Sequence, residues 1–585
     1  MYLETIQSPQ ALKGLTVKEL PALCQELRTT LLKKLSEHGG HIGPNLGFVE
    51  ATVAMHYVFD SPQDKFVFDV SHQSYTHKML TGRMQAFTDA AHYDDVSGYT
   101  NPAESAHDMF NVGHTSTSVS LACGLAKGRD LLSQKYHVVA VIGDGSLSGG
   151  EAFEGLNNVA ELGTNCIVIV NDNEMSIPEN RGGMYRNLKQ LRDTNGKAEC
   201  NFFKAMGLDY VYEDKGNDVE VLVELLRQVK DTDHPVVVHL HTQKGNGYGP
   251  AMRNREFFHW GFPFDLASGQ CKVQFEGENY QDLTGAYLMN QIKTRPEVVA
   301  ITAAMPMTFG FTPAMRVEAG KQFVDVGICE EHAIAMASGI AKAGGRPVFA
   351  LNSTFLQRTY DQLTQDLSLN GNPAVILVFY NGVYSLNDVT HTGFQDIPMI
   401  SNIPGLTYLS PVTKEEYFAM LDWAMTQKQG PVAIRVPERV VASGQPDKTD
   451  YNQLNKYEVK QRGKRVALLG LGVFQAQAAQ AAALLQQQGI RATLINPKFV
   501  SGVDTGLLES LKADHELVMT LEDGIMEGGF GAKIAQFYGD SAMKVLCRGL
   551  KKEFYDRFQV KPLLTELRLL PEQIAADILA LLNSK

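Results

Sequence analysis

Cysteine is scarce in this sequence, with seven residues in a chain of 585. They stand far apart, and none belongs to a CxxC pair or to a Cys/His spacing that suits zinc. A disulfide framework and a cysteine-rich metal site are therefore excluded as organising features. We expect free thiols at all seven positions, which are 24, 123, 166, 200, 271, 329 and 547.

Two other absences narrow the class of protein. The formal charge of −12 is spread along the chain without a basic block, which argues against nucleic acid or an anionic membrane as a partner. No segment offers about 18 uninterrupted apolar residues. The opening residues, MYLETIQSPQ, lack the charged and apolar pattern of a signal peptide. The sequence thus predicts a cytoplasmic protein whose partners are small molecules.

The chain is long enough for several hydrophobic cores, and 44% of its residues are hydrophobic. Apolar runs typical of buried strands alternate with helical stretches, which predicts doubly wound α/β domains. We expect three of them, over residues 1–272, 273–446 and 447–585. The expected strands are HVVAVIG and NCIVIV, then PVFALN and AVILVFY, then RVALLG, RATLINPKF and LVMTLED, with a helix over FQAQAAQAAALLQQQG.

The most informative segment runs from Gly143 to Asn173. GDG follows one predicted strand, and 25 residues separate it from NDN at the end of the next. Open α/β sheets bind ligands in crevices outside the carboxyl ends of their strands. Asp144, the Asn173 side chain and the Met175 carbonyl offer the oxygen ligands that Mg²⁺ prefers. The glycines beside Asp144 let the backbone approach a phosphate at the start of the following helix.

An ordinary glycine-rich strand-to-helix turn is the alternative explanation of GDG, and the second polar cluster argues against it. GDG followed by NDN at this spacing is the thiamine-diphosphate signature, and its surroundings resemble the 1-deoxy-D-xylulose-5-phosphate synthase family of the transketolase superfamily. The resemblance extends along nearly the whole chain. Its blocks are GGHIGPNLG at 39, FDVSHQSYTHKMLTGR at 68, VGHTSTS at 112, NDNEMSI at 171, KGNGY at 244, CEEHA at 329, STFLQRTYDQ at 353 and THTGFQD at 390.

The resemblance implies three domains of transketolase-like type, the last of them mainly structural and assisting dimerisation. It implies a homodimeric transferase that depends on thiamine diphosphate and Mg²⁺. The implied reaction condenses pyruvate with the aldehyde D-glyceraldehyde 3-phosphate, releasing carbon dioxide and giving 1-deoxy-D-xylulose 5-phosphate. Isoprenoid and thiamine biosynthesis are the implied pathways.

Cofactor contacts carry over by matched motif. Glu330, at a predicted strand-to-helix junction, matches the glutamate that hydrogen-bonds the aminopyrimidine ring and favours its imino tautomer. A glutamate at a helix start can also merely complement the helix dipole, but the metal motif upstream favours the catalytic role. The other implied cofactor positions are His72, Gly113, His114, Thr115, Gly145, Ser146, Asn173, Lys244, Tyr248 and Phe355.

Further histidines are expected near the reacting carbon. His41, His259 and His391 match family positions there, and Asp388 lies close to His391 in the sequence. Imidazole suits proton transfer near neutral pH. Exposed loop histidines are the alternative, and it is strongest for His259 because the other two lie inside longer matching blocks.

The acceptor end departs from the family pattern. Asn352 stands in place of a tyrosine, Asn381 in place of an arginine, and Glu438 intrudes into RVPER. Asparagine cannot copy the bidentate phosphate binding of arginine, so we expect an altered acceptor site. Arg358 and Arg435 remain as candidate anchors for the substrate phosphate.

A second departure lies after Ile177, where the segment that covers the active site in the family is shorter, which predicts a more open site. Two alternative functions stay open. One is a synthase-like paralogue that takes another aldehyde, or a sugar-phosphate ketol donor as transketolase does. The other is a catalytically silent binding protein, which intact Asp144, Asn173 and Glu330 disfavour.

Overall fold

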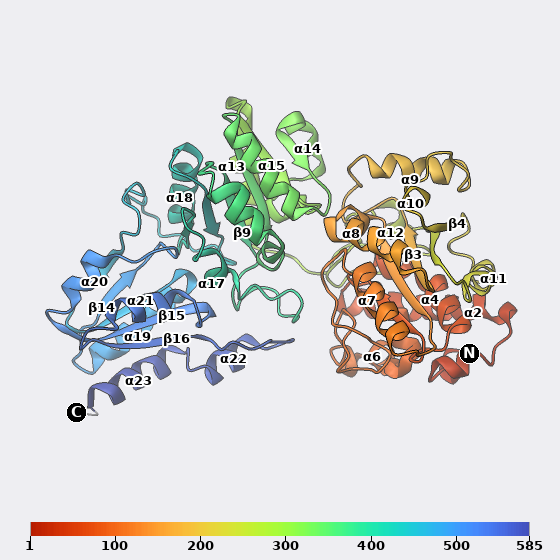
Figure 1. Ribbon diagram of the computed structural model, residues 1–585. Coiled ribbons are helices and arrows are strands. Elements are labelled where there is room, and N and C mark those ends of the chain that lie inside the picture. Colours follow the sequence, from red (N-terminus) through yellow and green to blue (C-terminus); the bar gives the residue numbers. More distant parts are fainter. Residues whose placement is uncertain (1, 584–585) are drawn as a thin grey trace. The chain divides into compact units, whose positions relative to one another are not determined.

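The structure is a computed structural model that describes residues 2–583. The chain forms two compact units. Among the described residues, unit 1 contains 2–276 and 327–329, and unit 2 contains 277–326 and 330–583. Figure 1 follows the elements of each unit along the chain.

Unit 1 is built on one five-stranded sheet in the order β1-β2-β3-β5-β4. Every strand pair in it is parallel. Parallel strands end at the same edge, so the residues that follow β1, β2 and β3 gather there. The strands are β1 (Lys65–Phe68), β2 (Val138–Gly143), β3 (Cys166–Asp172), β4 (Asp209–Glu213) and β5 (Pro235–His241).

Both faces of this sheet are covered, because successive residues of each strand point to opposite sides. Val139 and Val141 of β2 belong to one core, and Val138 and Ala140 belong to the other. The first core includes α2, α4 and α11, and the second includes α7 to α10. The helices of unit 1 are α1 (Pro9–Leu12), α2 (Leu20–His38), α3 (Gly43–Gly47), α4 (Val49–Val58), α5 (Tyr75–Lys78), α6 (Gln85–Thr88), α7 (Ser118–Leu131), α8 (Gly150–Val159), α9 (Met184–Asp193), α10 (Phe202–Ala205), α11 (Val219–Val229) and α12 (Gly249–Arg253).

Unit 2 contains two sheets. The first is fully parallel, in the order β10-β11-β9-β8-β6-β7. The second has the order β12-β14-β13-β15-β16, and only the β12–β14 pair is antiparallel. The strands are β6 (Val298–Thr302), β7 (Phe323–Asp325), β8 (Arg346–Asn352), β9 (Val375–Phe379), β10 (Thr407–Leu409), β11 (Val432–Arg435), β12 (Glu458–Gln461), β13 (Arg465–Gly470), β14 (Thr493–Asn496), β15 (His515–Ile525) and β16 (Lys544–Leu550).

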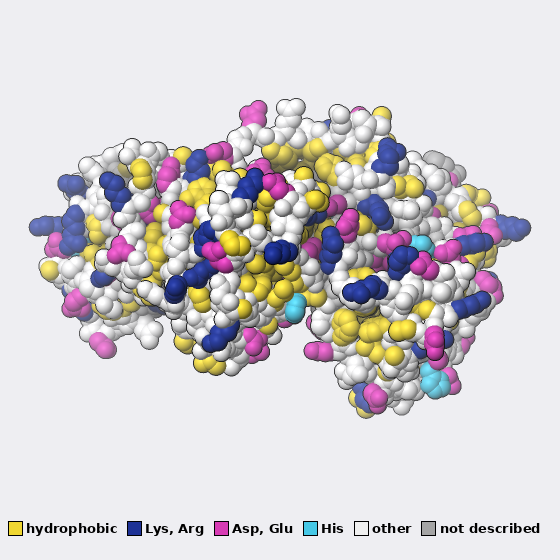
Figure 2. Space-filling model, turned by 90° about the horizontal axis from the view of Figure 1, so that it is seen from above, with side chains coloured by type: hydrophobic (Ala, Val, Ile, Leu, Met, Phe, Trp, Pro, Cys, Tyr) yellow, Lys and Arg dark blue, Asp and Glu magenta, His cyan; other side chains and the backbone are white. Residues whose placement is uncertain are grey.

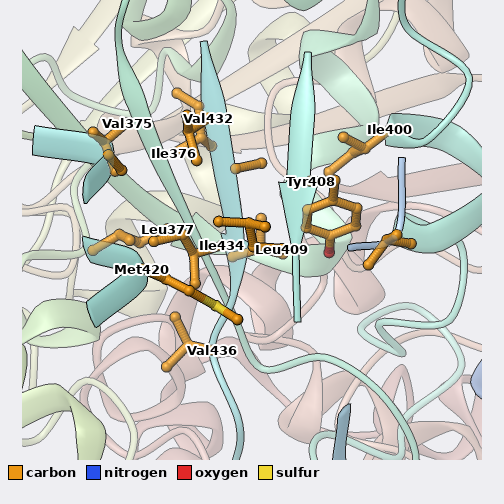
Figure 3. Packing of buried hydrophobic residues seen from close by; sticks show 14 of the residues in the cluster. Val375, Ile376, Leu377, Ile400, Tyr408, Leu409, Met420, Val432, Ile434 and Val436 are labelled. Carbon is orange, nitrogen blue, oxygen red and sulfur yellow. The ribbon is translucent and has the colours of Figure 1, made fainter. Parts of the chain in front are cut away.

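The core of the first unit 2 sheet combines aliphatic residues with aromatic ones such as Phe349, Phe379 and Tyr408. Figure 3 shows Leu377 of β9 and Ile434 of β11 packed near Met420 of a covering helix. The helices of unit 2 are α13 (Tyr280–Thr294), α14 (Pro313–Ala319), α15 (Glu330–Lys342), α16 (Tyr360–Gln362), α17 (Asp396–Ile400), α18 (Lys414–Thr426), α19 (Gln475–Gln487), α20 (Thr505–Leu511), α21 (Phe530–Tyr538), α22 (Val560–Glu566) and α23 (Pro571–Asn583).

The predicted α/β class with three sheets is confirmed, and each sheet lies inside one of the three predicted ranges. The domain boundaries themselves stay predictions. One strand differs in length, because β3 continues through Asn171 to Asp172 instead of ending at Val170. Its last residues pair in register with Leu240 and His241 of β5, which extends the ladder.

Three features can be compared with the sequence analysis: the distribution of surface charge, the character of the helices and the state of the cysteines. On the face shown in Figure 2, basic and acidic side chains are interspersed. In residues 2–583, no helix combines the length and apolar character that a membrane crossing requires. All seven cysteines are free thiols.

Candidate active site

The predicted metal ligands meet at the carboxyl edge of the unit 1 sheet. Asp144 directly follows β2, and its backbone N–H donates to the Asn171 carbonyl at 3.1 Å. Asp144 and Asn173 are both buried, and Oδ1 of Asn173 has no hydrogen-bond partner. An isolated β-bridge to Glu179 holds the backbone of Met175. A carboxylate, an amide oxygen and a main-chain carbonyl are thus available at one edge.

This donor set fits Mg²⁺. Burial and the nearby Asp172 carboxylate raise the pKa of Asp144 well above its ordinary value, and a bound cation would relieve both effects. The buried Asn173 oxygen without a hydrogen-bond partner is likewise a group that a cation could bind. In residues 2–583 no group of three His, Cys, Asp or Glu side chains could hold a metal ion, and the donor set described here combines one carboxylate with two neutral oxygens.

The glycines of the GDG turn are required by close packing. A Cβ atom on Gly145 would lie 2.7 Å from the Cβ of Ser176, and one on Gly149 would lie 2.1 Å from Oγ of Ser116. Both distances are far below van der Waals contact, so only glycine fits. Ser146 is buried in the same turn, and its carbonyl accepts a hydrogen bond from Ser116 Oγ at 2.8 Å.

The loop that contains Gly113, His114 and Thr115, called the GHT loop below, is held in place by Asp69, a residue that the sequence analysis missed. Asp69 follows β1, and its two carboxylate oxygens accept hydrogen bonds from the backbone N–H groups of Ser116 and Ser118, at 2.8 and 2.9 Å. Ser116 has φ of +75°, which these bonds help to hold. Asp69 thereby positions the loop that carries Gly113, His114 and Thr115, of which the last two are half-buried. The strand-end rule that identified Asp144 also applies to Asp69.

Three predicted histidines form one cluster in unit 1. The ring centre of His41 lies 5.0 Å from that of His72 and 5.9 Å from that of His259, and His72 and His259 are 5.2 Å apart. Tyr99 adds a fourth ring, 5.6 Å from His41. His259 is therefore no isolated loop histidine.

Burial keeps two of these imidazoles neutral. It lowers the pKa of His72 to about 4, with a further contribution from Lys244. Burial, together with Lys244, also holds the pKa of His259 well below its usual value. Nδ1 of His259 is buried without a hydrogen-bond partner. At neutral pH these two rings are uncharged. They can therefore form hydrogen bonds, but they do not act as imidazolium acids.

Lys244 and Tyr248 occupy different surroundings although they lie close in the sequence. The ammonium of Lys244 donates to the Ser176 carbonyl at 2.5 Å, and burial lowers its pKa to about 7 against the opposing effect of Asp144. Tyr248 donates its hydroxyl proton to the Leu266 carbonyl at 3.0 Å. Lys244 thus lies within the metal-ligand region, whereas the Tyr248 hydroxyl serves a local backbone contact.

The short segment after Ile177 packs against Asp144 at the carboxyl edge of the unit 1 sheet. Asn180 donates to Asp144 Oδ2 at 2.5 Å, and the Tyr185 hydroxyl donates to the Asp144 carbonyl at 3.1 Å. Arg192 of α9 forms an ion pair with Asp172. The segment therefore contacts Asp144, the predicted metal ligand, directly. Asn180 is a second residue that the sequence analysis missed, because nothing in its local sequence pattern indicates this contact.

Glu330 is the first residue of α15 in unit 2. It is 3% exposed, and its Oε2 lies 3.8 Å from Nη1 of Arg358, outside hydrogen-bonding range. Burial raises the pKa of Glu330 to about 7, although Arg358 and the helix N-terminus favour the charged form. Desolvation thus outweighs both favourable effects. A buried carboxyl with an unpartnered oxygen suits a hydrogen bond to a ring nitrogen of a ligand.

Asp388 and His391 are connected through a third residue, Thr390. The Thr390 hydroxyl lies 2.7 Å from Oδ1 of Asp388 and 2.8 Å from Nδ1 of His391. Because the carboxylate only accepts, the hydroxyl donates to Asp388 and accepts from His391 Nδ1–H. The ring of Phe355 meets that of His391 edge-on, with centres 5.7 Å apart. The sequence analysis named both ends of this relay but missed Thr390.

The acceptor candidates differ sharply in their surroundings. Arg435 is buried, and it donates to Asp396 at 2.6 Å and to Asp523 at 2.5 Å. Asn381 donates to the carbonyls of Val378 and Val436, both at 2.8 Å, and so ties the ends of β9 and β11 together.

The other two departures from the family pattern, Asn352 and Glu438, also belong to unit 2. Asn352 accepts from Thr308 at 3.4 Å. Glu438 is half-buried, and burial raises its pKa. Arg435, Asn381 and Asn352 thus have structural hydrogen-bonding roles.

Family profiles match most of the chain. Residues 3–201 match "1-deoxy-D-xylulose-5-phosphate synthase", residues 278–443 match "Transketolase, pyrimidine binding domain", and residues 455–574 match "Transketolase, C-terminal domain". A protein of Symbiobacterium thermophilum named 1-deoxy-D-xylulose-5-phosphate synthase is 38% identical over 100% of this chain and 95% of its own. The chain belongs to the 1-deoxy-D-xylulose-5-phosphate synthase family.

A second sequence relative belongs to the same family. The Geobacter sulfurreducens protein named 1-deoxy-D-xylulose-5-phosphate synthase 1 is 37% identical over 100% of this chain and 98% of its own. Among solved structures, a transketolase of Campylobacter jejuni aligns over 97% of this chain and 100% of its own, with 16% identity and a TM-score of 0.44. Family membership rests on the sequence relatives.

The predicted site residues fall in the ranges of two profiles. The predicted metal ligands Asp144 and Asn173 and the loop of Gly113, His114 and Thr115 lie in the range of the synthase profile, and Glu330, Phe355 and His391 lie in the range of the pyrimidine-binding profile. Unit 1 therefore carries the groups suited to a diphosphate and a cation, and unit 2 carries the buried carboxyl suited to a pyrimidine.

Proposed function

We propose that the chain catalyses the condensation of pyruvate with D-glyceraldehyde 3-phosphate to 1-deoxy-D-xylulose 5-phosphate and carbon dioxide, using thiamine diphosphate and Mg²⁺. The observation that carries the proposal is Glu330, whose buried Oε2 accepts no hydrogen bond, in a chain of this family. Thiamine diphosphate supplies, when bound, the electron sink for the decarboxylation.

Unit 1 would bind the charged end of the cofactor. Asp144, Asn173 and the Met175 carbonyl would coordinate Mg²⁺, and the cation would neutralise the diphosphate. Gly145 and Ser146 lie in the turn beside Asp144, where backbone groups can approach phosphate oxygens.

Unit 2 would bind the ring end. Glu330, whose pKa of about 7 leaves it partly protonated at neutral pH, would donate a hydrogen bond to a pyrimidine nitrogen. Phe355, which is partly buried against the core, would pack against the ring face.

The remaining polar groups would act on the substrates. His391 would deliver the proton that the acceptor aldehyde oxygen needs as the new carbon–carbon bond forms, while Asp388 and Thr390 keep its Nδ1 protonated. The cluster of His41, His72 and His259 would orient substrate oxygens by hydrogen bonds. Arg358, beside Glu330, is the phosphate anchor that we propose, since Arg435 is neutralised by two aspartates.

A second acceptor class is favoured by one observation. Arg435 cannot bind a substrate phosphate without leaving Asp396 and Asp523 as unpaired buried charges. The alternative is the same decarboxylating chemistry with an unphosphorylated aldehyde. Turnover measured with pyruvate and a panel of aldehydes separates the two, because a higher kcat/KM for glyceraldehyde than for its 3-phosphate would reject the phosphate version.

We also propose a homodimer, on the strength of family membership. Light scattering of the purified protein at several concentrations tests it, with a mass near twice 64.4 kDa expected. A mass near 64.4 kDa throughout would contradict it.

A further inference from the structure

The loop that carries His391 connects β9 to α17 and spans residues 380–395 (Figure 1). Its base is closed by a hydrogen bond from the Gly382 N–H to the Gly393 carbonyl, at 3.0 Å. A Cβ atom on Gly382 would lie 1.8 Å from a carboxylate oxygen of Asp523, a residue of β15. The loop base therefore packs directly on the last sheet of unit 2.

The residues that flank this base belong to the core of that last sheet. Val383 and Phe394 are buried, and they pack with the hydrophobic residues of β13, β15 and α19. The ring of Phe394 lies 5.7 Å from that of Tyr555 and 5.6 Å from that of Phe558. Both partners come from the connection between β16 and α22, residues 551–559.

The same connection holds the tip of the loop. The Arg557 N–H donates to the Asn387 carbonyl at 2.7 Å, and Asn387 Nδ2 donates to the Phe558 carbonyl at 3.2 Å. The Val389 N–H donates to Oδ1 of Asp556 at 3.2 Å. Asn387 and Val389 are the two neighbours of Asp388, so the backbone on both sides of that aspartate is anchored.

The Asp388 side chain is the group that contacts Thr390 and, through it, His391. With its neighbours anchored, its carboxylate accepts from both the N–H and the hydroxyl of Thr390, at 3.0 and 2.7 Å. The hydroxyl in turn accepts from His391. The contact at Asp556 is thus linked to the His391 imidazole through Val389, Asp388 and Thr390.

We propose that Asp556 is a positioning residue for His391, and that the C-terminal sheet domain thereby contributes to the reaction. This inference rests on the proposed function, in which His391 protonates the acceptor oxygen. Misplacing a catalytic group by about 1 Å costs up to about a hundredfold in rate. We expect Asp556→Ala to lower the kcat/KM for the acceptor about tenfold.

The experiment uses the full-length protein with thiamine diphosphate and Mg²⁺. Asp556→Ala removes the acceptor for the Val389 N–H, whereas Asp556→Asn keeps an oxygen in its place. Asp540→Ala, an exposed aspartate of the same unit, is the matched control. Each variant is assayed for acceptor kcat/KM and for cofactor affinity. Asp556→Ala is also made in a His391→Gln background.

The proposal expects a loss in Asp556→Ala only, rescue in Asp556→Asn, unchanged cofactor affinity, and less than about a twofold further loss in the His391→Gln background. It is overturned if Asp556→Ala matches Asp540→Ala. It is also overturned if the loss is equally large without His391, or if cofactor affinity falls in parallel.

A reading independent of turnover separates this inference from the proposed function. Hydrogen exchange of peptides covering 384–393 should rise in Asp556→Ala and stay at the wild-type level in Asp556→Asn. Unchanged exchange overturns the inference even where the wild type makes 1-deoxy-D-xylulose 5-phosphate. Absence of that product in the wild type rejects the proposed function alone, and the exchange measurement then decides whether Asp556 positions the loop.

Discussion

Arg358 lies beside Glu330, with Nη1 3.8 Å from Oε2, yet that carboxyl oxygen accepts no hydrogen bond. The pair is too long to offset desolvation, so burial raises the pKa of Glu330 to about 7. The carboxyl of Glu330, at the start of α15, therefore has a pKa close to neutral pH. The proposed chemistry needs a proton donor at this position.

Replacing this acid should stop turnover without releasing the cofactor. In Glu330→Gln we expect turnover to fall about a hundredfold or more, because an amide cannot exchange the proton. Mg²⁺-dependent binding of thiamine diphosphate, measured by calorimetry, should remain, since the diphosphate end is bound by unit 1. Glu331→Gln is the matched control. Near-wild-type turnover in Glu330→Gln would refute the assignment.

The same residue predicts a pH-dependent stability in the absence of cofactor. A carboxyl with a pKa of about 7 when folded and 4.5 when unfolded stabilises the protein fully below pH 4.5. That contribution is lost as pH rises through 7, by about 3 kcal/mol in total. Glu330→Gln does not titrate, so its melting temperature should gain on the wild type between pH 5 and pH 8. A constant difference would contradict the pKa shift.

The metal site is tested through Asn173. Its buried Oδ1 has no partner, so Asn173→Ala removes a ligand without breaking an internal hydrogen bond of that oxygen. We expect Mg²⁺-dependent affinity for thiamine diphosphate to weaken at least about tenfold in a Mg²⁺ titration. Asn157→Ala, an exposed asparagine of α8, should match the wild type. Equal affinities in both variants would exclude Asn173 as a ligand.

Thr390 is tested by removing its hydroxyl alone. Thr390→Val keeps the side-chain shape but breaks the hydrogen bonds to Asp388 and His391. The rate of condensation with the aldehyde should fall about tenfold, while carbon dioxide release from pyruvate without acceptor is retained. Thr390→Ser keeps the hydroxyl and should be close to wild type. If valine and serine behave alike, the relay has no role.

Sequence patterns predicted the elements that carry the proposed metal site. The runs VVAVIG and CIVIV are continuous because both faces of the unit 1 sheet are covered, and they led directly to Asp144 and Asn173. The end of β3 was placed two residues early, because Asn171 and Asp172 are polar although they pair with β5.

Side-chain partnerships were much harder to predict. Arg435 was expected to bind substrate, but its partners Asp396 and Asp523 lie 39 and 88 residues away in the sequence. Only the fold brings these charges together. Thr390 was missed for a different reason: its place between Asp388 and His391 in the sequence does not indicate that its hydroxyl contacts both, and only the geometry of the turn makes it a bridge.

The most direct test of the whole account is a product analysis. Purified protein is incubated with thiamine diphosphate, Mg²⁺, pyruvate and D-glyceraldehyde 3-phosphate, and the product is identified by mass. We predict 1-deoxy-D-xylulose 5-phosphate, formed together with carbon dioxide and absent when either substrate or Mg²⁺ is withheld. Consumption of pyruvate without that product would contradict the assigned acceptor, and no consumption of pyruvate would contradict the proposed catalytic chemistry.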